Sequence, residues 1–202
     1  MKTKILSIAT ILFIVFSVSN KTFATSKDGD NTTVLTNVRN INKIEIHGNV
    51  QLYVSTGETD KVKVYDTYYN QNALVQEQDG VLRISSYKNE KLVVWVTVSD
   101  LRTLVAYDNA SVESFGQFSA PELTININNN ASATMNLDCV EAKIAVNDSA
   151  KANITGTVAQ SNIVVNQGAT LNTVNFYAEQ NTIKHILPAV IVKNELDILA
   201  AN

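Results

Sequence analysis

Six carboxylates between residues 104 and 176 are the first candidates for catalytic residues. Between residues 104 and 176 the only bases are Lys143 and Lys151, and the acids are Asp108, Glu113, Glu122, Asp138, Glu141 and Asp148. Two carboxylates about 5–10 Å apart can cleave a glycosidic bond. Asp108 and Asp148 fall two repeats apart in the pattern described below, or roughly 10 Å, which is near the upper limit for an inverting pair. We therefore predict no catalytic residue and no enzyme, with a glycosidase or lyase as the weaker alternative.

The oxygens of Asp108, Asn129 and Asp148 are also candidates for holding a calcium ion. These residues share one column of the repeat, and Ca²⁺ takes several oxygen ligands at about 2.3–2.6 Å. The sequence lacks the Gly-Gly-x-Gly-x-Asp pattern of calcium-binding repeats. We therefore predict no metal and no cofactor, and leave an ion at this column as an open question. His47 and His185 lie in different segments without Cys or carboxylates at ligand spacing, so they are not expected to share a metal.

Aromatic residues are the remaining candidates for recognition. Tyr107 and Phe115 flank the first repeat, and the first half contains a cluster formed by Tyr65, Tyr68 and Tyr69. Exposed rings can stack on sugars or anchor a protein interface. Packing at the ends of the fold also accounts for them, so no ligand-binding residue is assigned. Cys139 has no His or Lys beside it and is predicted to be a small buried side chain rather than a reactive thiol.

Alternating apolar and polar residues predict an all-β chain. Residues 44–54 and 62–64 alternate, and they are bounded by turns at 56–60 and at Asp79-Gly80. Residues 92–98 are apolar on both faces, which predicts a strand covered on both sides with Trp95 in the core. The elements of this fold must therefore be strands joined by Gly-, Asp- and Asn-containing turns.

The second half of the chain repeats itself. Four segments align on a final Ala, and these Ala residues are 21, 19 and 19 residues apart: 104–110, 125–131, 144–150 and 163–169. An apolar column follows (Val112, Ala133, Ala152, Leu171), and the opposite face carries Ser111, Ser132, Lys151 and Thr170. Apolar columns at fixed spacing predict stacked coils. We predict a short right-handed β-solenoid with coils of about 19–21 residues and an antiparallel N-terminal part.

Asn is unusually common, at 24 positions, and it gathers at the ends of these repeats. Asn128, Asn147 and Asn166 share one column, and the next column contains Asp108, Asn129, Asp148 and Gln167. Asn and Asp tolerate left-handed backbone angles and hydrogen-bond to nearby backbone. We therefore place them at the corners of the coils, where their side chains can form a ladder from coil to coil.

The N-terminus predicts export. Lys2 and Lys4 precede an apolar run over residues 5–18, and a small-residue site ends at Ala24, as in a secretory signal peptide. This run of fourteen residues is shorter than the ~20 apolar residues that span a bilayer. We predict a signal peptide over 1–24, a flexible leader over 25–33, a β-solenoid domain over 34–187 and a tail over 188–202. Removal of three of the 16 basic and none of the 19 acidic residues leaves a net charge of −6, which disfavours nucleic acid as a partner.

Several motifs resemble the auto-transporter adhesin, head GIN domain family of Gram-negative bacteria, the Bacteroides group in particular. They are the alternating segment 42–54, the strands at 62–64 and 79–84, and the small-residue repeats with Asn-Ala-Ser and Asp-Ser-Ala, and the resemblance covers about residues 34–187. It implies an exported β-helix-like domain with no established enzymatic activity, and it brings no set of functional residues. Asp148-Ser149-Ala150 also matches a short O-glycosylation motif of exported Bacteroides-type proteins, and its modification is left open.

We therefore predict an exported, non-enzymatic β-solenoid of the periplasm or cell surface, which binds or adheres through a face rich in Asn, Ser and Thr. A structural envelope protein with protein partners only is the alternative. The expected partner is a glycan or a cell-envelope protein, no transmembrane segment remains after signal removal, and open solenoid ends favour self-association.

Overall fold

The computed structural model describes residues 32–35, 38–65 and 73–186, and this part of the chain is all-β. It consists of fourteen strands and their connections, without a helix among the described residues. Accordingly, these ranges contain no helix with the length and apolar character needed to cross a membrane. The expected signal peptide and tail lie outside the described residues. The first strand begins at Thr32 and so includes the last two residues of the expected leader.

The strands alternate in burial wherever one face meets the core. Their bounds are β1 Thr32–Leu35, β2 Lys43–Gly48, β3 Val50–Thr56, β4 Lys61–Tyr65, β5 Ala73–Gln78, β6 Val81–Ser86, β7 Leu92–Val98, β8 Thr103–Ala106, β9 Ser111–Ser114, β10 Phe118–Ile127, β11 Ser132–Val146, β12 Lys151–Asn166, β13 Thr170–Asn172 and β14 Phe176–Ile186.

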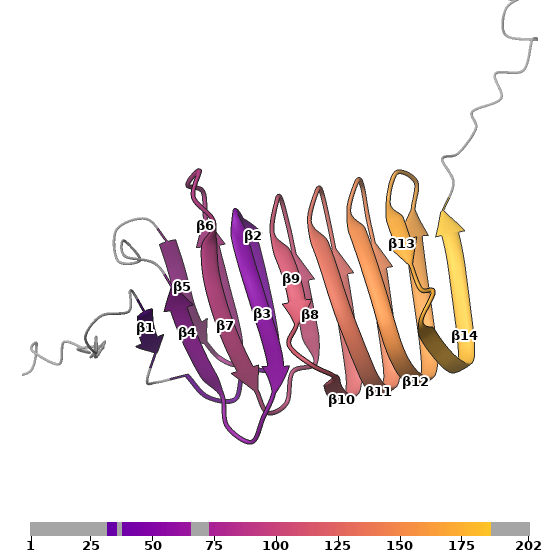
Figure 1. Ribbon diagram of the computed structural model, residues 1–202, viewed down its shortest axis with the longest axis horizontal. Helices are drawn as coiled ribbons and strands as arrows, with labels where there is room; N and C mark the ends of the chain where they lie inside the picture. Colours follow the sequence, from indigo (N-terminus) through magenta and orange to yellow (C-terminus); the bar gives the residue numbers. More distant parts are fainter. Residues whose placement is uncertain (1–31, 36–37, 66–72, 187–202) are drawn as a thin grey trace, which may run out of the picture.

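All fourteen strands belong to one mixed sheet that doubles back on itself. One arm, the first ladder, contains β5, β6, β2, β8, β10, β11, β12 and β14 in spatial order. The other arm, the second ladder, contains β1, β4, β7, β3, β9, β11, β12 and β13. β11 and β12 are long enough to serve both arms, because their N-terminal ends pair in the second ladder and their C-terminal ends in the first. Figure 1 shows the strands stacked along the long axis, with tight turns along the upper edge.

Pairing in the second half follows the repeat predicted from the sequence. Ile125 lies beside Ile144 and Ile144 beside Ile163, so each step along this ladder equals one repeat and the strands run parallel. Leu104 lies beside Ile125, and Ile183 lies beside Ile163, so the coils on either side continue the same parallel order. The apolar column and the polar column of the opposite face are also in the expected register. A repeated apolar column therefore predicted the correct neighbours.

The first half differs from the expected antiparallel arrangement. Of its described strands, β2 and β3 pair in parallel on both sides and extend both ladders. β6 and β7 pair in parallel with β2 and β3, and only their other edges pair antiparallel, with β5 and β4; β1 in turn pairs antiparallel with β4. Spatial order also departs from chain order, since β2 lies between β6 and β8. Lys43 of β2 pairs with Thr103 of β8, although β3 to β7 lie between them in the chain. No short repeat marks such a pairing, so the alternation alone could not distinguish parallel from antiparallel neighbours.

One apolar core runs the length of the stack. The inward column of the first ladder passes through Leu82, Ile44, Leu104, Ile125, Ile144 and Ile163, all at most 2% exposed. Burial of such side chains contributes roughly 1.5–3 kcal/mol each. Cys139 is also buried, as predicted, and its burial is the main reason that the pKa of its thiol is raised. The core thus explains the alternation, and it leaves the outward side chains free for other roles.

Candidate functional site

Tight turns form a column along one edge of the stack. In each, the N–H of the repeated Ala donates to the carbonyl oxygen three residues earlier: Ala110 to Tyr107, Ala131 to Asn128, Ala150 to Asn147 and Ala169 to Asn166. Asp108, Asn129 and Asp148 occupy the second position of the first three turns with φ of 57–60°. The prediction that these short polar residues adopt left-handed angles is therefore confirmed.

The fourth turn differs from its predicted alignment. Gln167 occupies the position equivalent to Asp148, but the residue with positive φ in this turn is Gly168, at 92°. Asn and Asp reduce the steric cost of a left-handed backbone angle by hydrogen-bonding to nearby backbone, whereas the longer side chain of Gln does not. Glycine carries no Cβ and adopts positive φ without steric cost. The positive angle consequently moves one residue along the turn.

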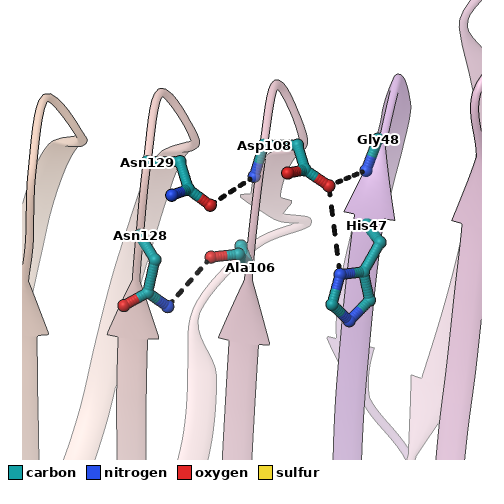
Figure 2. Close-up of polar contacts among 6 residues, drawn as sticks. All are labelled: His47, Gly48, Ala106, Asp108, Asn128 and Asn129. Carbon is teal, nitrogen blue, oxygen red and sulfur yellow. Dashed lines mark hydrogen bonds and ion pairs between the residues drawn. The ribbon is translucent and has the colours of Figure 1, made fainter.

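Side-chain oxygens of the second turn position connect consecutive turns (Figure 2). Asp108 Oδ2 accepts the N–H of Gly48 at 3.0 Å, and Asn129 Oδ1 accepts the N–H of Asp108 at 3.2 Å. Asp148 Oδ2 accepts the N–H of Asn129 at 2.9 Å. Each oxygen therefore satisfies a backbone donor of the neighbouring turn. We call this set the Asp/Asn column.

A second column of amides runs beside the first. The Nδ2 of Asn128 donates to the Ala106 carbonyl at 3.2 Å (Figure 2). The Nδ2 of Asn147 donates to Asn128 Oδ1 at 2.8 Å, and the Nδ2 of Asn166 donates in turn to Asn147 Oδ1. The predicted ladder of Asn side chains is thus present, and Asn147 is the member that both donates and accepts within it.

Replacement of Asn147 by alanine is expected to lower the free energy of unfolding by about 1–3 kcal/mol, because two side-chain hydrogen bonds are lost and two part-buried amide groups lose their partner. Urea unfolding monitored by circular dichroism measures this change. Ser149→Ala, at an exposed position of the same turn, is the control and should change it by less than about 0.5 kcal/mol. Equal effects of both variants would contradict the role of the Asn ladder.

Asp108 and Asp148, the carboxylates considered both as a catalytic pair and as ion ligands, take part in the Asp/Asn column. Asn129 separates Asp108 from Asp148 in the column, and the Oδ2 atom of each carboxylate accepts a backbone N–H. Among the residues that the structure describes, no three or more His, Cys, Asp and Glu side chains are grouped as a metal site. The Asp/Asn column therefore has a structural role: its hydrogen bonds hold neighbouring turns at a fixed spacing.

His47 and His185 lie in strands at different places in the stack, β2 and β14. His47 stacks on Tyr107, with ring centroids 4.5 Å apart and planes 9° apart, and its Nδ1 lies 3.9 Å from Asp108 Oδ2. Tyr107 is thereby placed against a neighbouring coil. Among the other aromatic candidates, Tyr65 is 41% exposed at β4, whereas Tyr68 and Tyr69 lie outside the described residues.

Three aromatic rings meet on the outer face of the second ladder, and we call them the aromatic cluster. Tyr53 and Trp95 stack with centroids 4.6 Å apart, and Phe115 contacts Trp95 edge-on at 5.2 Å. The prediction that Trp95 lies in the core is wrong. Val94 and Val96 point inward and are buried, so the pleat of β7 directs Trp95 outward, where it is half-buried. Phe115 is 64% exposed.

A row of outward-facing residues continues from this cluster across the second ladder. Successive pairs in the strand register are Lys63–Trp95, Trp95–Tyr53, Tyr53–Glu113, Glu113–Thr134, Thr134–Asn153 and Asn153–Asn172. We call this the outer row. The sequence repeat predicted a polar column on this outer face (Ser111, Ser132, Lys151 and Thr170), but it did not predict the outer row itself or its aromatic residues. The strands β4, β7 and β3 are neighbours in the sheet, but no sequence repeat predicts this order. Only the tertiary fold therefore brings Lys63, Trp95 and Tyr53 together.

Two groups of charged side chains on the first ladder form ion pairs. On the outer side of the first ladder, Lys143 lies 2.8 Å from Glu122 and 3.0 Å from Glu141. The hydrogen bond from Lys143 is the main reason that the pKa of Glu122 is lowered. A second group contains Lys43, Glu45 and Arg83, where the hydrogen bond from Lys43 is the main reason that the pKa of Glu45 is lowered. These acids are ionised partners in surface ion pairs, rather than acids whose pKa is raised for proton donation.

Comparison with solved structures supports the same fold. The chain is similar to a putative adhesin from Parabacteroides distasonis (15% identity, TM-score 0.56, covering 78% of this chain and 79% of that one). It is also similar to a putative adhesin from Parabacteroides merdae (17% identity, TM-score 0.55, covering 80% of each chain). A P. distasonis structure described as a putative lipid binding protein is comparable (12% identity, TM-score 0.56, covering 75% and 76%). At these identities the likeness concerns the fold alone.

No curated protein matches the chain. A family model does: the one described as putative auto-transporter adhesin, head GIN domain, matches residues 40–186. This range contains both ladders from β2 to β14, the Asp/Asn column and the outer row. The chain therefore belongs to the putative auto-transporter adhesin, head GIN domain family.

Proposed function

We propose that this protein is an exported, non-enzymatic binding domain that attaches to extended glycans at the cell surface or in the periplasm. Its successive parallel strand pairs would be the coils of a right-handed β-solenoid, with the coil length that the sequence repeat predicts. The observation that carries the proposal is the outer row, which runs past the aromatic cluster and continues over polar side chains across seven strands. Phe115 is the exposed ring of this cluster, whereas Tyr53 and Trp95 are half-buried. Family membership supports an adhesin-like role at a general level.

The chemistry of the outer row suits a sugar polymer. Tyr53, Trp95 and Phe115 provide ring faces and edges on which pyranose rings can stack. Lys63 and Glu113 flank the cluster, and Thr134, Asn153 and Asn172 continue as uncharged donors and acceptors. Six steps of ~4.8 Å between strands give the row a length of about 29 Å. That length matches an oligosaccharide of several units better than a single small ligand.

Export and the absence of catalysis are parts of the same proposal. The N-terminal pattern over 1–24 supports export. The outer row contains one acid, Glu113, and one base, Lys63, and three strand steps separate them, so the row does not bring two acid/base groups together. Trp95, the single tryptophan of the chain, offers a direct test. Its fluorescence should change when a polysaccharide binds the aromatic cluster, and a glycan array should identify the sugar.

Replacement of Phe115 by alanine should weaken glycan binding at least tenfold, since loss of one exposed stacking ring corresponds to about 1.4 kcal/mol. Isothermal titration calorimetry with the sugar found on the array measures the change. Tyr87→Ala is the matched control, because Tyr87 is 76% exposed but is not part of the outer row, and it should leave affinity within twofold.

Three outcomes would count against the proposed function. Equal losses in the Phe115 and Tyr87 variants would remove the aromatic cluster as the site. Capture of a single envelope protein without any glycan signal would favour a structural envelope protein with protein partners only. Turnover of a polysaccharide by the purified protein would make it a carbohydrate-active enzyme.

A further inference from the structure

The outward face of the second ladder carries more positive than negative charge. Among the described strand residues that pair in this ladder and point outward, Lys61, Lys63 and Lys151 are basic, and Glu113 is the only acid. These four residues are exposed. The mature chain is expected to have a net charge of −6, so the charge of this face is opposite to that of the chain as a whole.

The lysines of this face also differ from those of the first ladder in their partners. On the first ladder, Lys43 and Lys143 are each held within 3.0 Å of a carboxylate. Within the described ranges, none of Lys61, Lys63 and Lys151 takes part in an ion pair. An ammonium group without an acidic partner attracts anions from solution, and several such groups on one face strengthen this attraction.

A fourth ammonium group lies near the middle of the ladder. Lys91 directly precedes β7, and its Nζ donates to Ser111 Oγ of β9 at 3.5 Å. Lys63 on β4 and Lys151 on β12 lie on either side of this position, separated from each other by five strand steps or about 24 Å. The positive groups are therefore spread along the ladder, which suits a polymer with repeated negative charges better than a single small anion.

The aromatic cluster lies between these ammonium groups. Lys63 is the strand neighbour of Trp95, and Phe115, which is 64% exposed, contacts Trp95 edge-on. A sugar that stacks on an aromatic ring does so through its C–H face, so its acidic substituents stay at the rim of the sugar ring. At the rim they meet the lysines, whose ammonium groups form charge-assisted hydrogen bonds with such acids.

We propose that the ligand of this face is an acidic polysaccharide, whose carboxylate or sulfate groups pair with Lys63, Lys91 and Lys151 while its sugar rings stack on the aromatic cluster. This inference rests on the proposed function and narrows its ligand to one chemical class. Single-stranded nucleic acid also offers rings and negative charges, but the N-terminal export pattern and the net charge of −6 favour the polysaccharide.

Acidic and neutral polysaccharides with the same backbone provide the test. The two pairs are polygalacturonate with its methyl ester, and dextran sulfate with dextran. In at least one pair, the acidic polymer should bind at least about tenfold more tightly than its neutral partner, and its affinity should fall as NaCl is raised. Isothermal titration calorimetry and the fluorescence of Trp95 measure the binding.

Single charge variants show whether the lysines of this face are the cause. Lys63→Gln and Lys151→Gln should each weaken binding of the acidic polymer at least about threefold, whereas Glu113→Gln removes the opposing charge and should strengthen it. Lys184→Gln is the matched control, because Lys184 is an exposed strand residue that pairs in the first ladder, and it should leave the affinity within about twofold.

Equal affinity for the acidic and neutral polymers of both pairs would overturn this inference and leave the proposed function in place. Equal effects of the Lys63, Lys151 and Lys184 variants would do the same. Tighter binding of single-stranded oligothymidylate than of either acidic polysaccharide would assign the face to nucleic acid and would also overturn the inference. If no polysaccharide binds, on the glycan array or in these titrations, the inference and the proposed function are both wrong.

Discussion

Replacement of Gly156 by alanine is expected to lower the free energy of unfolding by more than about 3 kcal/mol. Gly156 lies within β12 at φ 104°, which an L-residue adopts only with strain. A Cβ at this position would overlap the carbonyl oxygen of Leu137 and approach its nitrogen to 2.7 Å. These are backbone atoms of the adjacent strand, in direct register with Gly156, so they cannot rotate away.

Gly116 provides the matched control for this substitution. Its φ is 78°, but an added Cβ would have no atom within 4 Å. Gly116→Ala should therefore cost only the backbone strain, about 1–2 kcal/mol. Equilibrium unfolding in urea, followed by Trp95 fluorescence and circular dichroism, compares the two. Similar losses for both would show that close packing of β11 on β12 is not what requires Gly156.

Replacement of Phe118 by alanine is expected to cost about 3–5 kcal/mol, which is the second large effect. Phe118 is 1% exposed and is among the largest fully buried side chains of the described residues. It lies beside Leu137 at the beginning of β10, so its removal leaves a cavity between β10 and β11. Differential scanning calorimetry or urea unfolding measures the loss.

Phe115, three residues earlier, is the internal control for Phe118. It is 64% exposed, and its ring contacts Trp95 on the outer face. Phe115→Ala should thus cost less than about 1 kcal/mol. If Phe118→Ala prevents folding, Phe118→Leu keeps most of the volume and should still lose more stability than Phe115→Ala. A larger loss at Phe115 would contradict the assignment of the inner and outer faces.

Much of the second half could be predicted because its interactions recur at a nearly constant spacing. Val112, Ala133, Ala152 and Leu171 each stack on the equivalent residue of the next coil, so one alignment determines the whole column. The Asn ladder follows from the same spacing, since equivalent amides one repeat apart must meet. Gln167 was the exception, because the backbone angle depends on side-chain size as well as on position in the repeat.

The sequence predicted a polar outer face, but not the outer row or the aromatic cluster beside it. The sequence predicts Trp95 in the core, and this prediction fails because apolar residues on both faces of a strand do not show which face is turned to the solvent. Tyr53 and Trp95 lie in β3 and β7, and Phe115 directly follows β9. These three strands are neighbours in space but not in the chain. No periodicity connects these three positions.

The sequence by itself therefore determined the all-β class, the family, the stacking of residues 104–172 and the Asn and Asp corners, since each depends on residue types at regular intervals. The tertiary structure decided the order of β2 to β7, the parallel direction of their pairing and the formation of the aromatic cluster. Parallel neighbours such as Lys43 and Thr103 are separated in the chain by all the strands from β3 to β7. Such contacts are selected by the burial of the complete core, to which every strand contributes one apolar face, and not by any local pattern.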